Sequence, residues 1–205
     1  RTKSEMTVLN TKIAEIASEM TDFDAACPGV NNSPSSGCPP RGLVLETNGR
    51  AGTKGSIVSG QNPGSVGPAE RRHYVDNGAD YKQQLTAWNN IVRDVSYFTR
   101  LRQLLGYLNL DGPILWTDVA KCEGKAPPQE ILMSCSQRFL VRELAVIPSD
   151  WPVIAAGSRA FQALGYMAGA RAVVGLSHPT GSFAANRFLA LLSRLSQEPE
   201  YLAKV

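Results

Sequence analysis

The stretch Ser-Ile-Val-Ser-Gly-Gln-Asn-Pro-Gly, residues 56–64, decides the fold of this chain because an apolar run ends there in a polar turn. Residues 56–59 predict a buried strand, and Asn-Pro-Gly favours a tight turn, since Asn and Gly tolerate positive φ and Pro fixes its own. A second unit of this kind joins the apolar run 172–176 to the polar turn 177–180. Ligands of open α/β sheets bind at the carboxyl ends of the strands. The two turns therefore predict a site that contains Asn62 and His178.

The composition is that of an ordinary globular protein with one domain over residues 1–205. Hydrophobic residues make up 43% and charged residues 19% of the chain, and a length of 205 residues allows one proper core. No apolar run approaches the roughly 20 residues that a membrane span needs, and residues 1–5 do not resemble the start of a signal peptide. We therefore expect an intracellular, cytoplasmic monomer with no membrane partner.

Strand-like and helix-like segments alternate along most of the chain. This alternation favours a three-layer α/β/α fold around a central, mostly parallel four-stranded sheet. In the first helix, Val8, Ile13 and Ile16 are the expected buried stripe. Helices are expected at 3–20, 79–106, 130–144, from Ser158 onward and at 183–197, and strand-like runs lie at 43–46, 56–59, 113–117, 152–156 and 172–176.

Four cysteines form two pairs, Cys27 with Cys38 in the loop 27–42 and Cys122 with Cys135 in the segment 121–135. Nothing marks the chain as secreted, which argues against structural disulfides. Ten and twelve residues separate the partners, too many for an ordinary zinc ribbon. A cluster held by four thiolates tolerates wider and irregular spacing. The pattern therefore indicates an iron–sulfur cluster, with unrelated buried thiols as the alternative.

The net charge of +3, from 21 basic and 18 acidic residues, permits a polyanionic partner without requiring one. Arg71 and Arg72 follow the first turn closely and are the candidates for phosphate contacts. Arg93, Arg100 and Arg102 share one expected helix, and we interpret them as a solvated helix face.

Five elements in this order resemble the uracil-DNA glycosylase superfamily, particularly its iron–sulfur branch, often called family four, over roughly residues 27–190. The segment 60–64 resembles the first motif, a Gly-x-x-Pro-Gly turn. The segment 115–122 resembles the strand that ends in Thr-Asn-Val-Val-Lys-Cys, and 155–157 resembles the next strand-to-helix turn. The segment 178–180 resembles the His-Pro-Ser motif, and the four cysteines lie where that branch has its own.

The resemblance implies a DNA glycosylase that flips a pyrimidine base out of the stack, hydrolyses its N-glycosidic bond and leaves an abasic site. His178 would donate to the base carbonyl as negative charge develops there, although a turn histidine bonded to the backbone is the alternative. Asn62 would orient the attacking water, because an amide has no useful pKa for a general base. Tyr74 would stack on the base or be a surface loop residue.

The resemblance also assigns contacts and a cofactor. A 4Fe–4S cluster would be structural and held by the four cysteines. The substrate would contact Gly60, Gln61, Pro63, Gly64, Tyr74 and Asp118. DNA, single- or double-stranded, would contact Arg71, Arg72, Ser177 and Thr180.

Asp118 departs from the family pattern, which has an asparagine that reads the uracil edge at this place. An ionised carboxylate has acceptors but no donor, so it repels the O4 carbonyl of uracil and suits the N4 amine of cytosine. Asp118 therefore predicts a shift toward cytosine or a modified cytosine, such as one in phage DNA. The alternative is an Asp118 side chain that turns away to cap a loop.

Neither motif contains a lysine that could attack the sugar, so a monofunctional enzyme is expected. Two other functions stay open, because fold does not fix function. One is a DNA-binding protein without turnover on the same fold, and the other is a nucleotide N-glycosidase. The sequence leaves open whether the role is repair or defence against modified foreign DNA.

Overall fold

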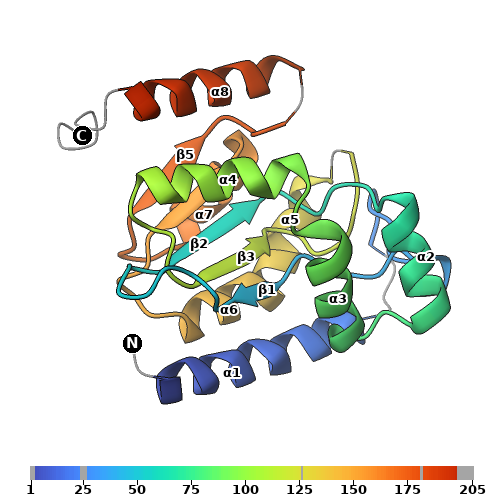
Figure 1. Ribbon diagram of the computed structural model, residues 1–205. Helices are drawn as coiled ribbons and strands as arrows, with labels where there is room; N and C mark the ends of the chain where they lie inside the picture. The colour runs from blue at the N-terminus through green and yellow to red at the C-terminus, as the bar shows by residue number, and fades with distance from the viewer. Residues whose placement is uncertain (1–2, 24–26, 126, 181, 198–205) are drawn as a thin grey trace.

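A computed structural model describes residues 3–23, 27–125, 127–180 and 182–197. A sheet with the strand order β1-β3-β2-β4-β5 lies between two layers of helices (Figure 1). The strands are β1 (Val44–Glu46), β2 (Ser56–Gly60), β3 (Ile114–Asp118), β4 (Val153–Ala156) and β5 (Val173–Leu176). The helices are α1 (Lys3–Thr21), α2 (Pro68–Asn77), α3 (Tyr81–Ala87), α4 (Ser96–Tyr107), α5 (Gln129–Cys135), α6 (Val141–Val146), α7 (Ser158–Met167) and α8 (Ser182–Gln197), with a 3₁₀ turn at Pro34–Ser36 and π-helical segments at Trp88–Val92 and Ser136–Leu140.

The predicted three-layer α/β/α fold is confirmed, but the sheet has five strands rather than four. Strands β2 to β5 pair in parallel, whereas β1 pairs antiparallel with β3 through Val44 opposite Trp116 and Glu46 opposite Ile114. Only three residues of β1 pair. The sheet is therefore mostly parallel, with one short antiparallel strand at its edge.

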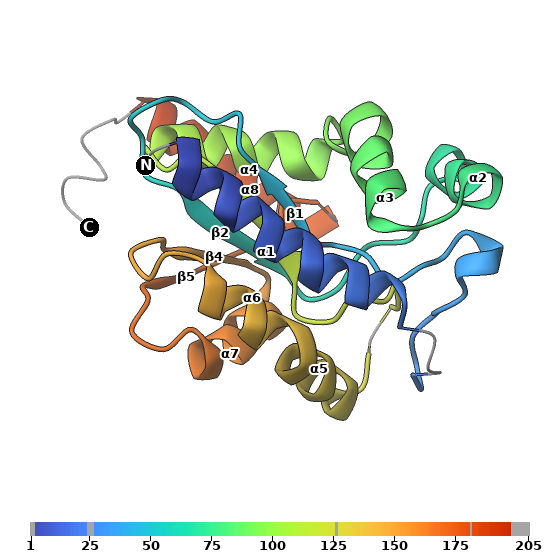
Figure 2. The same cartoon turned by 90° about the horizontal axis from the view of Figure 1, so that it is seen from below.

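Successive side chains of a strand point to opposite faces of the sheet. Alternate residues of each strand therefore belong to two separate hydrophobic cores. On one face, residues such as Ile57, Leu115 and Val153 pack against α1, α5, α6 and α7. On the other face, Val58 and Trp116 pack against α4 and α8. Seen from below, α1 lies across the sheet near α6 (Figure 2). Both faces are covered, which explains the continuous apolar runs in the strands.

Two predictions about helices need correction. Val8 is 53% exposed, whereas Leu9, Ile13 and Ile16 are buried. The buried stripe of α1 thus begins one residue later, because Leu9 rather than Val8 is four residues before Ile13. The single helix expected over 79–106 is broken, because a π-helical segment follows α3 and a turn precedes α4.

The carboxyl ends of the parallel strands meet at one edge of the sheet. Gly60 lies opposite Asp118, and Ala156 lies opposite Leu176. The chain leaves β2 toward β3 on one side and later reaches β4 on the other side of β2. Such a switch point opens a crevice where ligands bind in α/β sheets. In the described part of the chain, no helix is both long and apolar enough to cross a membrane.

Candidate active site

A cleft of about 780 Å³ opens at the carboxyl edge of the sheet. Its size is within the range of about 300–1,000 Å³ that is usual for ligand pockets. The cleft brings together most of the residues predicted from the motifs, while Ser177, Arg71, Arg72 and the four cysteines are not part of its wall. The predicted residues that line it are Gly60, Gln61, Asn62, Pro63, Gly64, Tyr74, Asp118, His178 and Thr180.

Asp118 ends β3 and lies between two glycines. A Cβ atom on Gly60 would be 2.5 Å from Asp118 Oδ1, and one on Gly42 would be 2.4 Å from Asp118 Oδ2. Gly42 also has a φ of +89°, which other residues rarely adopt. Both glycines are therefore required for the carboxyl group of Asp118 to occupy this place in the cleft wall.

The carboxyl group of Asp118 is poised between its two protonation states. Burial raises its pKa to about 7, although Lys121 and Arg41 oppose this shift. Glu143 adds to the rise, and the main chain of Gly60 favours the ionised form. Near neutral pH Asp118 can therefore present either acceptors alone or a donor together with an acceptor.

A buried network behind β3 fixes the end of this strand. Lys121 Nζ is 2.8 Å from Glu143 Oε1 and donates to Thr117 Oγ1 at 2.7 Å. The same amine donates to the carbonyl oxygen of Asp118 at 2.8 Å. Lys121 and Glu143 are 1% and 0% exposed, so removal of either charge would leave the other buried and unpaired. The network thus holds the backbone of Asp118 at the floor of the cleft.

The side chain of Asn62 is held by main-chain carbonyls of neighbouring loops. Its Nδ2 donates to the carbonyl oxygens of Gly124 at 2.9 Å and Pro63 at 3.1 Å, and a longer contact of 3.4 Å reaches Cys122. Its Oδ1 accepts from Gln61 Nε2 at 3.0 Å. An amide oxygen has two lone pairs, so Oδ1 is the atom of Asn62 that can still accept from a water.

His178 is exposed at the mouth of the cleft, on the turn after β5. Its Nδ1 is 3.3 Å from the amide nitrogen of Thr180 and 2.6 Å from the carbonyl oxygen of that residue. The amide contact needs Nδ1 as the acceptor and places the proton of the neutral ring on Nε2, whereas the shorter carbonyl contact needs a proton on Nδ1. Arg100 donates to the carbonyl oxygen of Pro179 at 2.5 Å and so ties this turn to α4. The backbone contacts thus orient His178 and leave Nε2 for a ligand.

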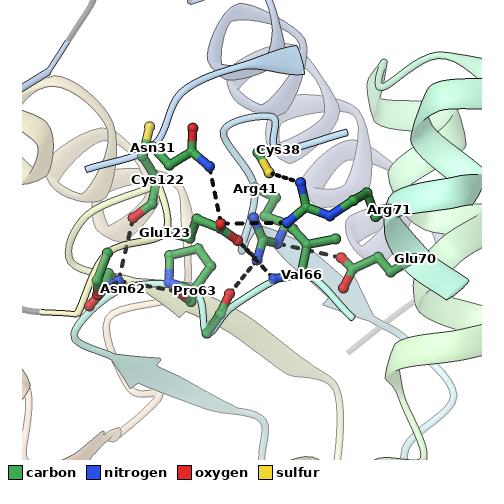
Figure 3. Close-up of polar contacts among 12 residues, drawn as sticks. Asn31, Cys38, Arg41, Asn62, Pro63, Val66, Glu70, Arg71, Cys122 and Glu123 are labelled. Carbon is green, nitrogen blue, oxygen red and sulfur yellow. Dashed lines mark hydrogen bonds and ion pairs between the residues drawn. The ribbon is translucent and has the colours of Figure 1, made fainter. Parts of the chain in front are cut away.

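A second buried network joins the first turn to the loop after β3 (Figure 3). Arg41 is 7% exposed, and its Nη2 lies 3.1 Å from Glu123 Oε2 and donates to the carbonyl oxygen of Gly64. Its Nε is 3.4 Å from Glu70 Oε1. Glu123 Oε2 also accepts from the amide of Val66 at 2.7 Å. Arg41 and Glu123 therefore fix the backbone on both sides of Ser65, next to the predicted substrate contacts.

Tyr74 is buried on α2 and is not a surface loop residue, because a helix forms over Pro68–Asn77. Its hydroxyl donates to Glu70 Oε1 at 3.1 Å, and its side chain lines the cleft. Arg71 is partly exposed and contacts the neighbouring loop, with Nη1 2.8 Å from Cys38 Sγ and 3.1 Å from the carbonyl oxygen of Ser36. Arg72 is exposed on the same helix. Of the two arginines predicted to bind phosphate, only Arg72 faces solvent fully.

The helix-face interpretation of three arginines also needs correction. Arg93 and Arg102 both pair with Glu46 at 3.0 Å, and Arg102 lies over the rings of Trp88 and Trp116. These cations are held by the protein rather than solvated.

Several residues of the cleft were missed by the sequence analysis because they come from segments without a motif. Tyr97 at the start of α4 packs its ring against His178, with 5.2 Å between ring centroids. Trp88 belongs to a π-helical segment, a feature frequent at functional sites. Lys125 and Arg159 are further cations of the cleft wall.

The cysteines fit a four-thiolate site only in part. Cys27, Cys122 and Cys135 line a second, small cavity of about 60 Å³, and the amide of Lys121 donates to Cys135 Sγ at 3.2 Å. Cys38 lies elsewhere, against Arg71. Burial and the other two thiols raise the pKa of Cys122 to about 12, so a metal would have to displace its proton. Within the described residues, no three His, Cys, Asp or Glu side chains converge closely enough to hold a metal ion.

Comparison with known protein families gives a match over most of the chain. The model of the uracil DNA glycosylase superfamily matches residues 49–198, which is well over half of the chain. The chain belongs to the uracil DNA glycosylase superfamily. Membership indicates a DNA glycosylase type of function, that of a hydrolase acting on DNA. No curated protein and no solved structure gave a significant match. The iron–sulfur branch within the superfamily remains a prediction.

Proposed function

We propose that this protein is a monofunctional DNA glycosylase that hydrolyses the N-glycosidic bond of a flipped-out pyrimidine and leaves an abasic site. One observation carries the proposal. Asn62 follows β2, Asp118 ends β3 and His178 follows β5, and all three line the same cleft. Asn62 supplies an acceptor for the attacking water, Asp118 an acceptor for the edge of the base, and His178 a hydrogen-bond donor. These are the groups that this hydrolysis requires.

The reaction assigns one task to each of these side chains. The bond between C1′ and the base breaks, and its electron pair leaves with the base. His178 Nε2–H donates to the base carbonyl, where negative charge develops, and such a donor acts mainly in the transition state. Asn62 Oδ1 holds the water whose oxygen bonds to C1′. The proton that this water loses ends on the departing base or in solvent.

Asp118 favours a cytosine-type base, either cytosine itself or a modified cytosine. Its carboxylate can accept from N4–H, and acidic residues make this pairing with cytosine in nucleic-acid recognition. Facing O4 of uracil, the carboxylate would meet a second acceptor. Removal of unmodified cytosine would damage the genome of the cell itself, so a modified cytosine of foreign DNA is the physiological substrate that we propose.

DNA is the proposed partner of a monomeric enzyme. Arg72 on α2 is exposed, and Lys125 and Arg159 belong to the cleft wall. Cations at these places suit phosphates on either side of a flipped nucleotide, and such contacts weaken as salt rises.

The test is incubation with single- and double-stranded oligonucleotides that carry uracil, hypoxanthine, cytosine or modified cytosines. Alkaline cleavage of the product would reveal abasic sites, and we expect release from at least one pyrimidine. No release under single-turnover conditions, with DNA binding intact, would favour a binding protein without turnover. Release from mononucleotides alone would indicate a nucleotide N-glycosidase. Cleavage without alkali, trapped by borohydride, would contradict the monofunctional assignment and point to Lys125.

We also propose that the chain binds a structural iron–sulfur cluster at the small cavity, through Cys27, Cys122 and Cys135. The anaerobically purified protein should be brown and contain about four iron and four sulfide per chain if the cluster is of the 4Fe–4S type. Cys122→Ser should lose iron and lower the thermal stability, while Cys38→Ser shows whether the fourth thiol takes part. Stoichiometric zinc, or free thiols without metal, would contradict the proposal.

A further inference from the structure

Tyr97 contacts the ring of His178, and its hydroxyl approaches Gly60 on the side where Asp118 also lies. It lies at the start of α4, and its ring is tilted by 44° against the ring of His178. Its side chain is part of the cleft wall, as are Asp118 and Gly60. The ring thus covers one side of the place where a base would contact His178.

The hydroxyl of Tyr97 and the carboxyl of Asp118 face the same notch, which is the place beside Gly60 where other residues have a side chain. A Cβ atom on Gly60 would be 3.2 Å from the hydroxyl oxygen of Tyr97 and 2.5 Å from Asp118 Oδ1. The Asp118 carboxylate lies near enough to Tyr97 to raise the pKa of its hydroxyl. The absence of a side chain at Gly60 therefore lets the two polar atoms approach the same residue of the cleft wall.

The two groups have complementary hydrogen-bonding roles. An ionised carboxylate only accepts, whereas a phenol carries an O–H that can donate. Burial and the nearby Asp118 carboxylate raise the pKa of Tyr97, so its hydroxyl keeps the proton. The notch at Gly60 thus presents a donor beside an acceptor.

We infer that Tyr97 is a specificity-determining residue that shares the recognition of the base edge with Asp118, its hydroxyl supplying the donor that the carboxylate lacks. This inference rests on the proposed glycosylase function. A cytosine-type base offers N3 as an acceptor beside its N4–H donor, and uracil offers O4 beside N3–H. In either base, the Tyr97 hydroxyl can donate to the acceptor and the Asp118 carboxylate can accept from the donor. The carboxylate alone can bond only to the donor.

The role of Tyr97 should depend on the charge of Asp118. Lys121 and Arg41 favour the carboxylate, and Glu143 and burial favour the neutral acid, so that Asp118 has a pKa of about 7. Below that pH the acid has its own O–H, which can replace the missing donor. Above that pH, Tyr97 is the donor that remains at the notch. Loss of its hydroxyl should therefore cost more as the pH rises through about 7.

The variant Tyr97→Phe removes the hydroxyl and keeps the ring. We expect its single-turnover excision rate to fall roughly 10–100-fold at pH 8.5, the loss typical of one unpaired polar group in a buried site. The loss should be smaller at pH 6 and larger for uracil than for cytosine-type DNA. DNA affinity and the melting temperature should stay close to those of the wild type.

Tyr81→Phe is the matched control. Tyr81 is buried on α3, outside the cleft wall, and its hydroxyl has no partner within the described residues. Its removal should leave both the rate and the pH profile unchanged. A Tyr97→Phe protein with the rate and pH profile of the wild type would overturn the inference, since a role in packing alone would not move the pH profile.

Binding of free cytosine and uracil, measured by calorimetry at pH 6 and pH 8.5, separates this inference from the proposed function. If the wild type excises no base but binds free pyrimidines, and Tyr97→Phe binds them more weakly at the higher pH, the glycosylase proposal fails and the role of Tyr97 stands. Equal binding by both proteins would overturn the role of Tyr97 whatever the excision assay shows. A wild type that neither excises nor binds pyrimidines would overturn both.

Discussion

Replacement of His178 by alanine should slow base excision by roughly tens to thousands of fold, the range measured for the loss of one preorganised donor or acid–base group. Main-chain contacts with Thr180 hold Nδ1, and Arg100 holds the carbonyl of the neighbouring Pro179. The ring is therefore oriented before the substrate arrives, and its loss removes the donor that this side chain supplies. Single-turnover rates on the best substrate of the base panel would measure the effect.

His73→Ala is the control for this prediction. The only other histidine of the chain lies on α2, where its Nε2 is 3.1 Å from the carbonyl oxygen of Gln83, and it is not part of the cleft wall. This variant should excise bases at the rate of the wild type. DNA affinity should change little in either variant. A near-normal rate for His178→Ala would mean that the active site lies elsewhere.

The layer architecture and the location of the cleft could be predicted from local patterns. Apolar runs that end at Gly60, Asp118 and Leu176 are short enough to be strands, and the polar turns after them mark where each strand ends. In a parallel sheet these ends meet at one edge. The meeting of Asn62 and His178 in one cleft thus follows from chain order and strand direction.

The contributions of Tyr97, Arg41 and Cys38 could not be predicted, because their contacts join segments far apart in the sequence. Tyr97 lies in the cleft wall at the start of α4, after the π-helical segment and the turn that follow α3. Arg41 pairs with Glu123, 82 residues later, and nothing in the sequence near either residue indicates the pairing. Cys38 follows a 3₁₀ turn that places it against Arg71, a geometry that cysteine spacing does not determine.

Asp118→Asn should raise activity on uracil and lower activity on cytosine-type DNA. The amide can accept from N3–H and donate to O4 of uracil, whereas the carboxylate meets O4 with a second acceptor. On a cytosine-type base, the amide can turn its oxygen to N4–H only by turning its donor away from the rest of the edge. Each polar group left unpaired in a buried pocket costs about 1–3 kcal/mol. The ratio of the two excision rates should therefore move by roughly one to two decades.

The ratio of the excision rates on uracil and cytosine-type DNA should also depend on pH. Asp118 has a pKa of about 7, so it is a neutral acid with its own donor at lower pH and a carboxylate at higher pH. In the wild type, the uracil-to-cytosine ratio should fall as pH rises through 7, less steeply than in Tyr97→Phe because the Tyr97 hydroxyl still donates. In Asp118→Asn this fall should disappear, since an amide does not titrate.

Asp76→Asn, on the exposed face of α2 and outside the cleft, makes the same change of charge and should leave both ratio and pH profile unchanged. The decisive measurement is the ratio of excision rates on uracil and cytosine-type DNA at pH 6 and pH 8.5 for the three proteins. Because two glycines enclose the carboxyl group, the amide fits the same space, and a changed fold would not explain a changed ratio. An unchanged ratio would mean that Asp118 does not face the base, and the preference for cytosine would then lose its support.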